Sequence, residues 1–215
     1  MISQRLKSLR EKTDAMTNRK IDVVEKLTAF QGYFRVDRYR LHHETFAGGM
    51  SEEVTREVFE RGHAASALPY DPIRDEIVLL EQFRVGALAA GREPWMIEIV
   101  AGIIEEGETP EALVRREIRE EAGLEALDLE PIGTYLLSPG GTSETMYFYC
   151  ARIDSSQAGG VFGLDEEGED IRAFVISGDE AEALLSSGRI ENGTTAIALQ
   201  WFVLNRQRLR EIWAN

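Results

Sequence analysis

Hydrophobic and polar residues alternate through the first third of the chain, a pattern typical of half-buried β-strands. The segments that carry it are KIDVVEKLTAF, GYFRVDRYRLHHETF and SEEVTREVFER, between residues 20 and 61, with glycines at 32 and at 48–49 between them. This arrangement predicts an antiparallel meander. A sheet of two or three strands is marginally stable alone, so it must pack against another part of the chain or a second copy. Residues 3–18 are polar and compatible with a helix.

From His63 onward the pattern changes to apolar strands interleaved with amphipathic helices. Strands are predicted at 63–71, 75–85, 95–102, 128–138, 143–153 and 171–177, helices at 110–122, 179–187 and 194–213, and loops at 86–94 and 154–170. Strands interleaved with helices indicate a layered α/β domain. We therefore expect two domains, residues 1–62 and residues 63–215.

Composition narrows the classes of partner. The formal net charge of −14 argues against nucleic acid as a simple electrostatic partner, because a phosphate backbone requires a basic surface. No stretch approaches the roughly 18 apolar residues that span a membrane, and the basic N-terminus lacks the apolar core of a signal peptide. A cytoplasmic location is the default expectation. Cys150, in the strand-like run TMYFYCARI, is expected to be a buried thiol rather than a nucleophile.

The segment Gly102–Leu124 is rich in acidic residues and contains the best-defined helix of the chain. Thr109 suits the N-cap, Pro110 the first helical position and Gly123 the C-terminal cap. The buried stripe of this helix is predicted to consist of Ala112, Leu113, Ile118 and Ala122.

Carboxylates on this helix suggest a metal site. Glu117 and Glu121 are four residues apart and share one face, with Glu120 close by. Oxygen ligands of this kind suit a hard cation such as magnesium or manganese. Arg116 is expected to neutralise part of the charge by pairing with Glu108. On its own, the run REIREE is more typical of a solvated helix face.

The full spacing favours the metal site. Gly102, Glu108 and the run REIREEAGL at 116–124 match every fixed position of the Nudix box, so the chain resembles the Nudix hydrolases. These enzymes cleave a nucleoside diphosphate linked to another moiety, with divalent metal. The resemblance implies an α/β/α sandwich with a mixed β-sheet. It gives structural roles in the box to Gly102, Glu108, Arg116, Glu120 and Gly123. It gives metal-ligand roles to the carbonyl of Ala101, Glu117, Glu121 and Glu169.

Outside the box, residues from about 30 to 202 resemble the bacterial ADP-ribose pyrophosphatases of this family. The resemblance is carried by GYFRVDRYR, EVTREVFERGHAA, DPIRDEIVLLEQFR, SPGGTSE, GLDEEGEDI and IALQW. It implies hydrolysis of ADP-ribose to AMP and ribose 5-phosphate, with Mg²⁺ (or Mn²⁺) as cofactor at about two or three ions per site. It also implies a homodimer in which the N-terminal sheet is exchanged and contributes to substrate recognition. The role of residues 1–19 stays open.

The same resemblance assigns individual residues. Glu167 is the expected general base, although spacing alone does not separate it from Glu166. The 154–170 segment that carries both is expected to close on the substrate; the alternative is a disordered acidic linker. Substrate contacts are expected at Tyr33, Phe34, Arg56, Glu57, Arg61, Arg84, Ile103, Ser138, Pro139, Gly140 and Glu144. Tyr33 stands where phenylalanine is common and keeps an aromatic face for adenine.

Alternative functions remain open at this point. The nearest is a Nudix pyrophosphatase for another nucleotide sugar such as GDP-mannose. A catalytically inactive fold that senses a nucleotide is a second alternative, disfavoured by the intact box. Decapping of mRNA is disfavoured by the acidic charge. The histidines His42, His43 and His63 have no accompanying cysteine or HExxH pattern, so a zinc site is not expected.

Overall fold

The computed structural model describes residues 19–164 and 168–213, which form two compact units. The first unit comprises the chain up to Arg61 together with Gly140–Ser143, and the second comprises the remainder. The sequence places the boundary one residue later and does not anticipate the short second segment of the first unit. The helix expected at 3–18, and Glu166 and Glu167, lie outside the described residues.

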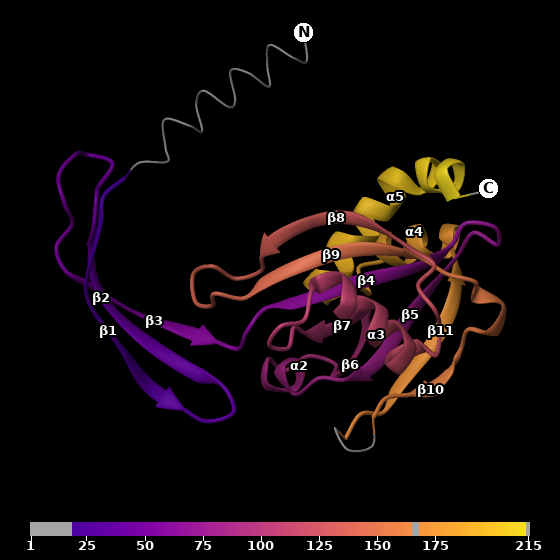
Figure 1. Ribbon diagram of the computed structural model, residues 1–215, viewed down its shortest axis with the longest axis horizontal. Coiled ribbons are helices and arrows are strands. Elements are labelled where there is room, and N and C mark those ends of the chain that lie inside the picture. Colours follow the sequence, from indigo (N-terminus) through magenta and orange to yellow (C-terminus); the bar gives the residue numbers. More distant parts are fainter. Residues whose placement is uncertain (1–18, 165–167, 214–215) are drawn as a thin grey trace, which may run out of the picture. The chain divides into compact units, whose positions relative to one another are not determined.

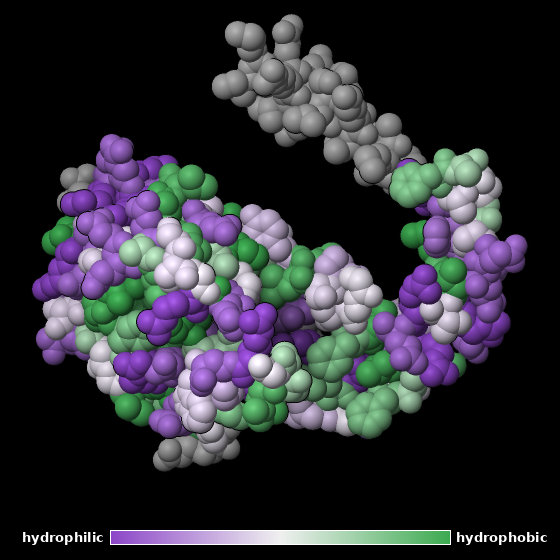
Figure 2. All heavy atoms as spheres, turned by 180° about the vertical axis from the view of Figure 1, so that it is seen from behind, coloured by the Kyte–Doolittle hydropathy of each residue, from purple (hydrophilic) through white to green (hydrophobic). Residues whose placement is uncertain are grey.

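The first unit contains the expected antiparallel meander. Its strands are β1 (Ile21–Gln31), β2 (Arg35–His43) and β3 (Val54–Glu60), with β2 in the centre. The apolar side chains of Ile21 and Phe30 in β1 are more than half exposed. Hydrophobic and hydrophilic residues are mixed on the surface of this unit (Figure 2). The segment Gly140–Ser143 lies beside β3, where the N–H of Phe59 donates to the carbonyl of Gly141 at 2.8 Å.

The second unit is built on a mixed eight-stranded sheet (Figure 1). Its strands are β4 (Ala64–Asp71), β5 (Glu76–Phe83), β6 (Trp95–Glu98), β7 (Val100–Ile103), β8 (Asp128–Leu136), β9 (Thr145–Arg152), β10 (Gly160–Phe162) and β11 (Ile171–Ser177). The main order is β10-β11-β5-β4-β9-β8, and β6 and β7 pair with β5 and β4. The β4–β9 pair is parallel, whereas the other pairs are antiparallel.

The apolar segment 95–102 differs from its prediction as a single strand. It forms β6 and β7, which are separated at Ile99 and pair with different neighbours. Each half is too short to show its own alternation, so periodicity could not reveal the change of partner. Glu98 at the end of β6 accepts a hydrogen bond from Asn192 beside α5, and Ala101 in β7 donates one to Glu121 of α3.

Helices cover both faces of this sheet. The helices of this unit are α2 (Val85–Ala89), α3 (Pro110–Ala122), α4 (Gly178–Ser186) and α5 (Gly193–Trp213), with a 3₁₀ turn at Ser155–Gln157, and α3, α4 and α5 form the covering layers. One buried cluster packs Ala65 and Ala67 of β4 against α3. The other packs Ala64 and Leu68 of β4 against α4 and α5. Alternate residues of one strand thus face opposite helical layers, which is the expected α/β/α sandwich.

Helix α3 begins and ends where the sequence predicts. The hydroxyl of Thr109 accepts a hydrogen bond from the N–H of Ala112 at 3.2 Å, and Gly123 adopts a left-handed φ of 66°. The predicted buried stripe is correct for Leu113, Ile118 and Ala122 and wrong for Ala112, which is exposed; Val114 is buried instead. On the Glu117–Glu121 side, the helix packs closely against β7.

Three short elements were not predicted. Helix α2 begins at the last residue of the predicted strand 75–85 and continues into the expected loop 86–94, and the 3₁₀ turn and β10 lie within the expected loop 154–170. Cys150 is fully buried in the apolar cluster beneath α5, and this burial raises the pKa of its thiol, in agreement with the prediction. Among residues 19–164 and 168–213, no helix combines the length and apolar character needed to cross a bilayer.

Candidate active site

The backbone of β7 passes unusually close to α3 at Gly102. A β-carbon at this position would lie 2.1 Å from Oε1 of Glu117, far inside a van der Waals contact. Gly102 belongs to β7 and its φ lies outside the left-handed region, so backbone conformation does not explain the glycine. The glycine is required instead because any side chain would displace the Glu117 carboxylate.

Glu121 lies one turn further along the same face of α3. It is 2% exposed, and its Oε2 accepts a hydrogen bond from the N–H of Ala101 at 3.1 Å. The β6–β7 segment therefore supplies both the close glycine and a backbone donor to the acidic face.

Arg116 braces the acidic face from one side. Its guanidinium contacts Glu108 at 3.1 Å, Glu120 at 2.8 Å and Glu117 at 2.9 Å. The expected Arg116–Glu108 pair is present, and Arg116 lowers the pKa of Glu108. One cation is thus shared among three carboxylates, and no arginine of the described residues forms an ion pair with Glu121.

The carboxylates that face β7 have raised pKa values, so their charged forms are disfavoured. Burial raises the pKa of Glu117 to about 7; Arg116 opposes this shift, while Glu120 and Glu169 add to it. Burial and then the charge of Glu117 raise the pKa of Glu121 well above its usual value, despite the hydrogen bond from Ala101. Buried carboxylates that raise one another's pKa values are stabilised when a cation binds between them.

Glu169 is brought to this acidic face by the end of the 154–170 segment. The N–H of Gly163 donates to the carbonyl of Glu120 at 3.3 Å, and the N–H of Leu164 donates to Glu169 Oε2 at 3.2 Å. A β-carbon on Gly163, whose φ is 107°, would collide with the Glu169 side chain at 2.7 Å. These contacts explain how a residue some fifty positions after the box reaches α3.

The donor set fits a hard cation in its chemistry. Glu117, Glu121 and Glu169 offer only oxygen atoms, and the first two are buried without a full counter-charge. In the described part of the chain, no three acidic, histidine or cysteine side chains are close enough together to form a complete cage. The described residues thus provide suitable ligands without a finished coordination geometry.

Arg84 follows β5 and is held by an acid that sequence reasoning missed. Its Nε and Nη2 donate to Oε2 of Glu98 at 3.0 and 2.8 Å. Glu98 is 5% exposed and is the only acid in the apolar run WMIEIVAG. The sequence did contain a signal for Glu98. It is a single carboxylate in a run that is otherwise apolar, and a buried charge requires a partner.

In the first unit, the expected aromatic contacts form a cluster. The rings of Tyr33 and Phe34 meet edge to face at 4.8 Å, and Phe34 contacts Phe59 in the same manner at 5.0 Å. Arg61 lies over the Phe34 ring at 5.9 Å. Tyr33 is 89% exposed and therefore available to a ligand. Phe59 was not predicted as a member of this cluster.

Arg56 and Glu57 are adjacent in β3, so their side chains point to opposite faces of the strand. Glu57 is paired with Arg38 at 2.9 Å, whereas Arg56 donates to the carbonyl of Thr55. The structure of this unit therefore does not bring the two expected contacts to one face.

The expected contacts of the SPGGTSE segment are divided between the units. Ser138, Pro139 and Glu144 belong to the second unit and Gly140 to the first. Glu144 is 7% exposed, and Ile103 at the end of β7 is 38% exposed.

The histidines have structural roles. His63 Nδ1 accepts the N–H of Thr145 at 3.2 Å, and the rings of His42 and His43 contact backbone carbonyls. Within the described residues they take part in no metal-ligand cluster.

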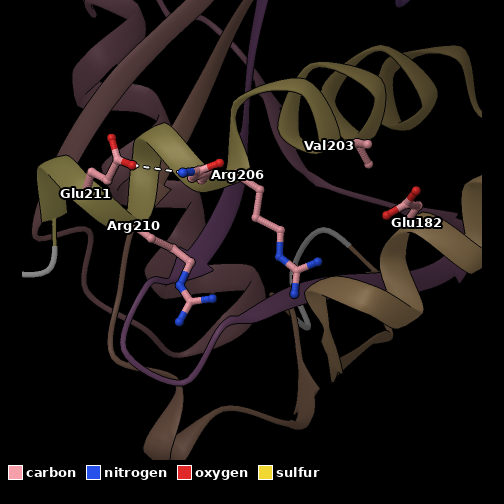
Figure 3. Close-up of a pocket in the computed structure, with 6 residues that line it drawn as sticks. Glu182, Val203, Arg206, Arg210 and Glu211 are labelled. Carbon is pink, nitrogen blue, oxygen red and sulfur yellow. Dashed lines mark hydrogen bonds between the residues drawn. The ribbon is translucent and has the colours of Figure 1, made fainter.

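A cavity of about 540 Å³ opens between α4 and α5 (Figure 3). It is lined by Glu182, Val203, Arg206, Gln207, Arg210 and Glu211. Asp75 and Asp179 already neutralise Arg206, and none of the candidate residues lines this cavity. We therefore assign the candidate site to the acidic face of α3.

Known proteins match most of the chain. The family described as "NUDIX domain" matches residues 60–194. The ADP-ribose pyrophosphatase of Escherichia coli strain K12 is 46% identical over 194 residues, covering 90% of this chain and 93% of the relative. The ADP-ribose pyrophosphatase of Haemophilus influenzae is 39% identical, covering 90% of each chain. A GDP-mannose pyrophosphatase of Pectobacterium atrosepticum is 32% identical, covering 86% of this chain and 94% of the relative.

A solved structure titled "Crystal structure of ADP compounds hydrolase" has the same fold. It aligns with a TM-score of 0.67 at 20% identity and covers 91% of this chain and 97% of its own. At this identity the likeness concerns the fold alone.

Proposed function

The chain belongs to the Nudix family, and from this premise we propose that it hydrolyses the diphosphate bond of ADP-ribose to AMP and ribose 5-phosphate. The single observation that carries the proposal is the acidic face of α3, where Glu117 and Glu121 are buried against Gly102 without a full counter-charge. The names of the 46% and 39% identical relatives support the choice of substrate.

Glu117, Glu121, Glu169 and the carbonyl of Ala101 would hold the divalent cations, with Mg²⁺ or Mn²⁺ as the preferred ions. When bound, such cations neutralise phosphate oxygens and lower the pKa of a water molecule. Nudix ADP-ribose pyrophosphatases in general depend on metal. The protein's own contribution is to fix the carboxylates; Arg116 holds Glu117 while β7 limits its movement at Gly102.

We propose Glu167 as the general base. It follows Leu164 and precedes Glu169, two residues that the structure ties to each other and, through Gly163, to the end of α3. A carboxylate base beside metal-bound water does not require a strongly raised pKa, because the metal already acidifies the water. The assignment rests on the family pattern, since Glu167 is outside the described residues.

Substrate recognition is proposed to involve both units. Arg84 would bind a phosphate oxygen, and Tyr33 and Phe34 would stack on the adenine ring. We further propose a homodimer in which the N-terminal sheet of one protomer contributes to the site of its partner. Light scattering tests the assembly, and full activity in a monomeric fraction would contradict the shared site.

The proposed reaction is tested by incubating the protein with Mg²⁺ and a panel of diphosphates, with product identification by mass spectrometry. AMP and ribose 5-phosphate released from ADP-ribose are the expected products. In water labelled with heavy oxygen, the labelled product identifies the phosphorus atom that is attacked.

A second candidate function is hydrolysis of another nucleotide sugar. The 32% identical GDP-mannose pyrophosphatase supports it, although that relative is more distant. A kcat/KM for GDP-mannose above that for ADP-ribose would favour this candidate. Absence of turnover on every diphosphate, combined with tight binding of ADP-ribose, would favour a nucleotide sensor.

A further inference from the structure

A buried polar network connects the first turn of α5 to Arg84, and Glu98 is at its centre. Oε2 of Glu98 accepts hydrogen bonds from Nε and Nη2 of Arg84 at 3.0 and 2.8 Å, and from Nε2 of Gln82 at 3.3 Å. Oε1 accepts from Nδ2 of Asn192 at 2.8 Å. A carboxylate that is 5% exposed and accepts four hydrogen bonds is well satisfied and has a fixed orientation.

Asn192 is itself fixed, because it caps α5. Its Oδ1 accepts the N–H of Thr195 at 3.0 Å, and its carbonyl accepts the N–H of Ala196 at 3.0 Å. The hydroxyl of Thr195 in turn accepts the N–H of Ile99 at 3.2 Å. The helix start and the β6–β7 junction therefore hold each other, and Glu98 is anchored from the side opposite Arg84.

Arg84 is paired with Glu98 and is also attracted by two carboxylates of the candidate site. Its side chain is 44% exposed. Burial opposes its charge, whereas Glu98 first, and then Glu121 and Glu169, raise the pKa of Arg84. The carboxylates of the candidate site therefore favour the charged guanidinium, in addition to Glu98. Without Glu98, the Coulomb attraction would draw Arg84 toward Glu121 and Glu169.

We propose that Glu98 is a positioning residue that holds Arg84 away from the acidic face of α3. Glu121 and Glu169 then stay available to cations. The pairing engages two of the five N–H donors of the guanidinium, so other donors can bind a phosphate oxygen. This role rests on the proposed function, because it presumes a metal-dependent reaction on a phosphate at the site.

The first test is a double-mutant cycle on the full chain with ADP-ribose and Mg²⁺. Glu98→Gln is expected to raise both the Mg²⁺ concentration for half-maximal rate and the KM by about tenfold, with a smaller change in kcat. In an Arg84→Ala background, the same substitution should change neither quantity further, because it acts through the arginine. Additive effects would overturn the proposal.

The second test does not depend on turnover. In metal-free protein labelled with ¹⁵N, the Arg84 Nε–H is expected to give a slowly exchanging NMR signal that Glu98→Gln abolishes. Titration of Mn²⁺, followed by electron paramagnetic resonance, should show about tenfold weaker binding in Glu98→Gln and wild-type binding when Arg84→Ala is added. If these results hold while no diphosphate is hydrolysed, the proposed function fails, whereas the effect of Glu98 on Arg84 and on cation binding stands. An unchanged Arg84 signal overturns the positioning role.

A matched pair of cap variants separates positioning from general destabilisation. Asn192→Ser keeps a capping oxygen on α5 but removes the amide donor to Glu98, and should raise the Mg²⁺ requirement about threefold. Ser177→Ala removes the cap of α4, where Ser177 and Glu180 form a capping box, and should leave the requirement unchanged. If both variants raise the Mg²⁺ requirement equally, the positioning role is wrong. Should Glu98→Gln fail to fold, Asn192→Ser carries the same comparison.

Discussion

Two groups of acids in the second unit are removed from water to a similar degree, but their pKa values shift in opposite directions. At the β4–β5 turn, Asp75 accepts hydrogen bonds from Tyr70 and Arg206, and these partners lower its pKa. On α3, burial raises the pKa values of Glu117 and Glu121, and the opposing contacts from Arg116 and the N–H of Ala101 do not offset it. The comparison distinguishes a carboxylate that stabilises the fold from one that requires an external cation.

Asp71, near Asp75, reinforces the contrast. It is 2% exposed, as deeply buried as Glu121, and burial opposes its charge in the same way. Hydrogen bonds from the backbone of Ser155 and Arg74 nevertheless lower its pKa. Burial alone therefore does not identify a functional carboxylate; the number of donors facing it does.

The largest expected effect is at Glu121. Glu121→Gln should reduce metal-dependent turnover by about 10³-fold or more, because a cation ligand is lost, while the thermal midpoint of the metal-free protein stays the same or rises. Steady-state kinetics and circular dichroism measure the two quantities. Glu125→Gln, at an exposed acid just after α3, is the matched control and should remain close to wild type. Retained turnover in Glu121→Gln would refute the metal assignment.

The next effect concerns the base. Glu167→Gln should lower kcat by about 10²- to 10⁴-fold, with little change in ADP-ribose affinity measured by calorimetry. Glu166→Gln is the neighbouring control. If Glu166→Gln is the damaging change, the base has been assigned one residue too late.

At the contrasting site, Asp75→Asn should destabilise the fold rather than impair the chemistry. Removing the charge leaves Arg206 without its main partner, and the free energy of unfolding should fall by about 2 kcal/mol. Urea denaturation measures this loss. At a temperature where the variant remains folded, kcat should be unchanged. A large fall in kcat there would remove the distinction between the two groups of acids.

The smallest effect is a pH dependence of the metal-free protein. The pKa of Glu117 is about 7 in the fold against an ordinary 4.5, so between these values the folded chain holds more protons than the unfolded chain. The contribution of this group to stability is therefore full below pH 4.5 and is lost as pH rises through 7. The free energy of unfolding of the wild type should therefore fall between pH 5 and 8. Glu117→Gln should make this fall smaller by about 1 kcal/mol. Equal declines in both proteins, measured by urea denaturation, would contradict the pKa shift.

Much of the fold was predictable because the signals are local. Thr109, Pro110 and Gly123 define the ends of α3 through hydrogen bonding and backbone conformation within a few residues. The strands of the first unit follow from alternation alone. The division of the segment 95–102 into β6, which pairs with β5, and β7, which pairs with β4, was not predictable. The sequence of a short apolar strand does not indicate which strand it pairs with.

The sequence by itself determined that the chain is a Nudix protein, with Glu117 and Glu121 on one helix face and Arg116 beside them, since helical geometry places residues at these spacings together. Only the tertiary structure decided which of its acids are neutralised. Gly102 accommodates the Glu117 carboxylate because β7 passes against α3, and Glu98 meets Arg84 because β6 pairs with β5. The charge balance of each carboxylate depends on donors brought from distant segments, and these contacts exist only once the sheet and its helices are assembled.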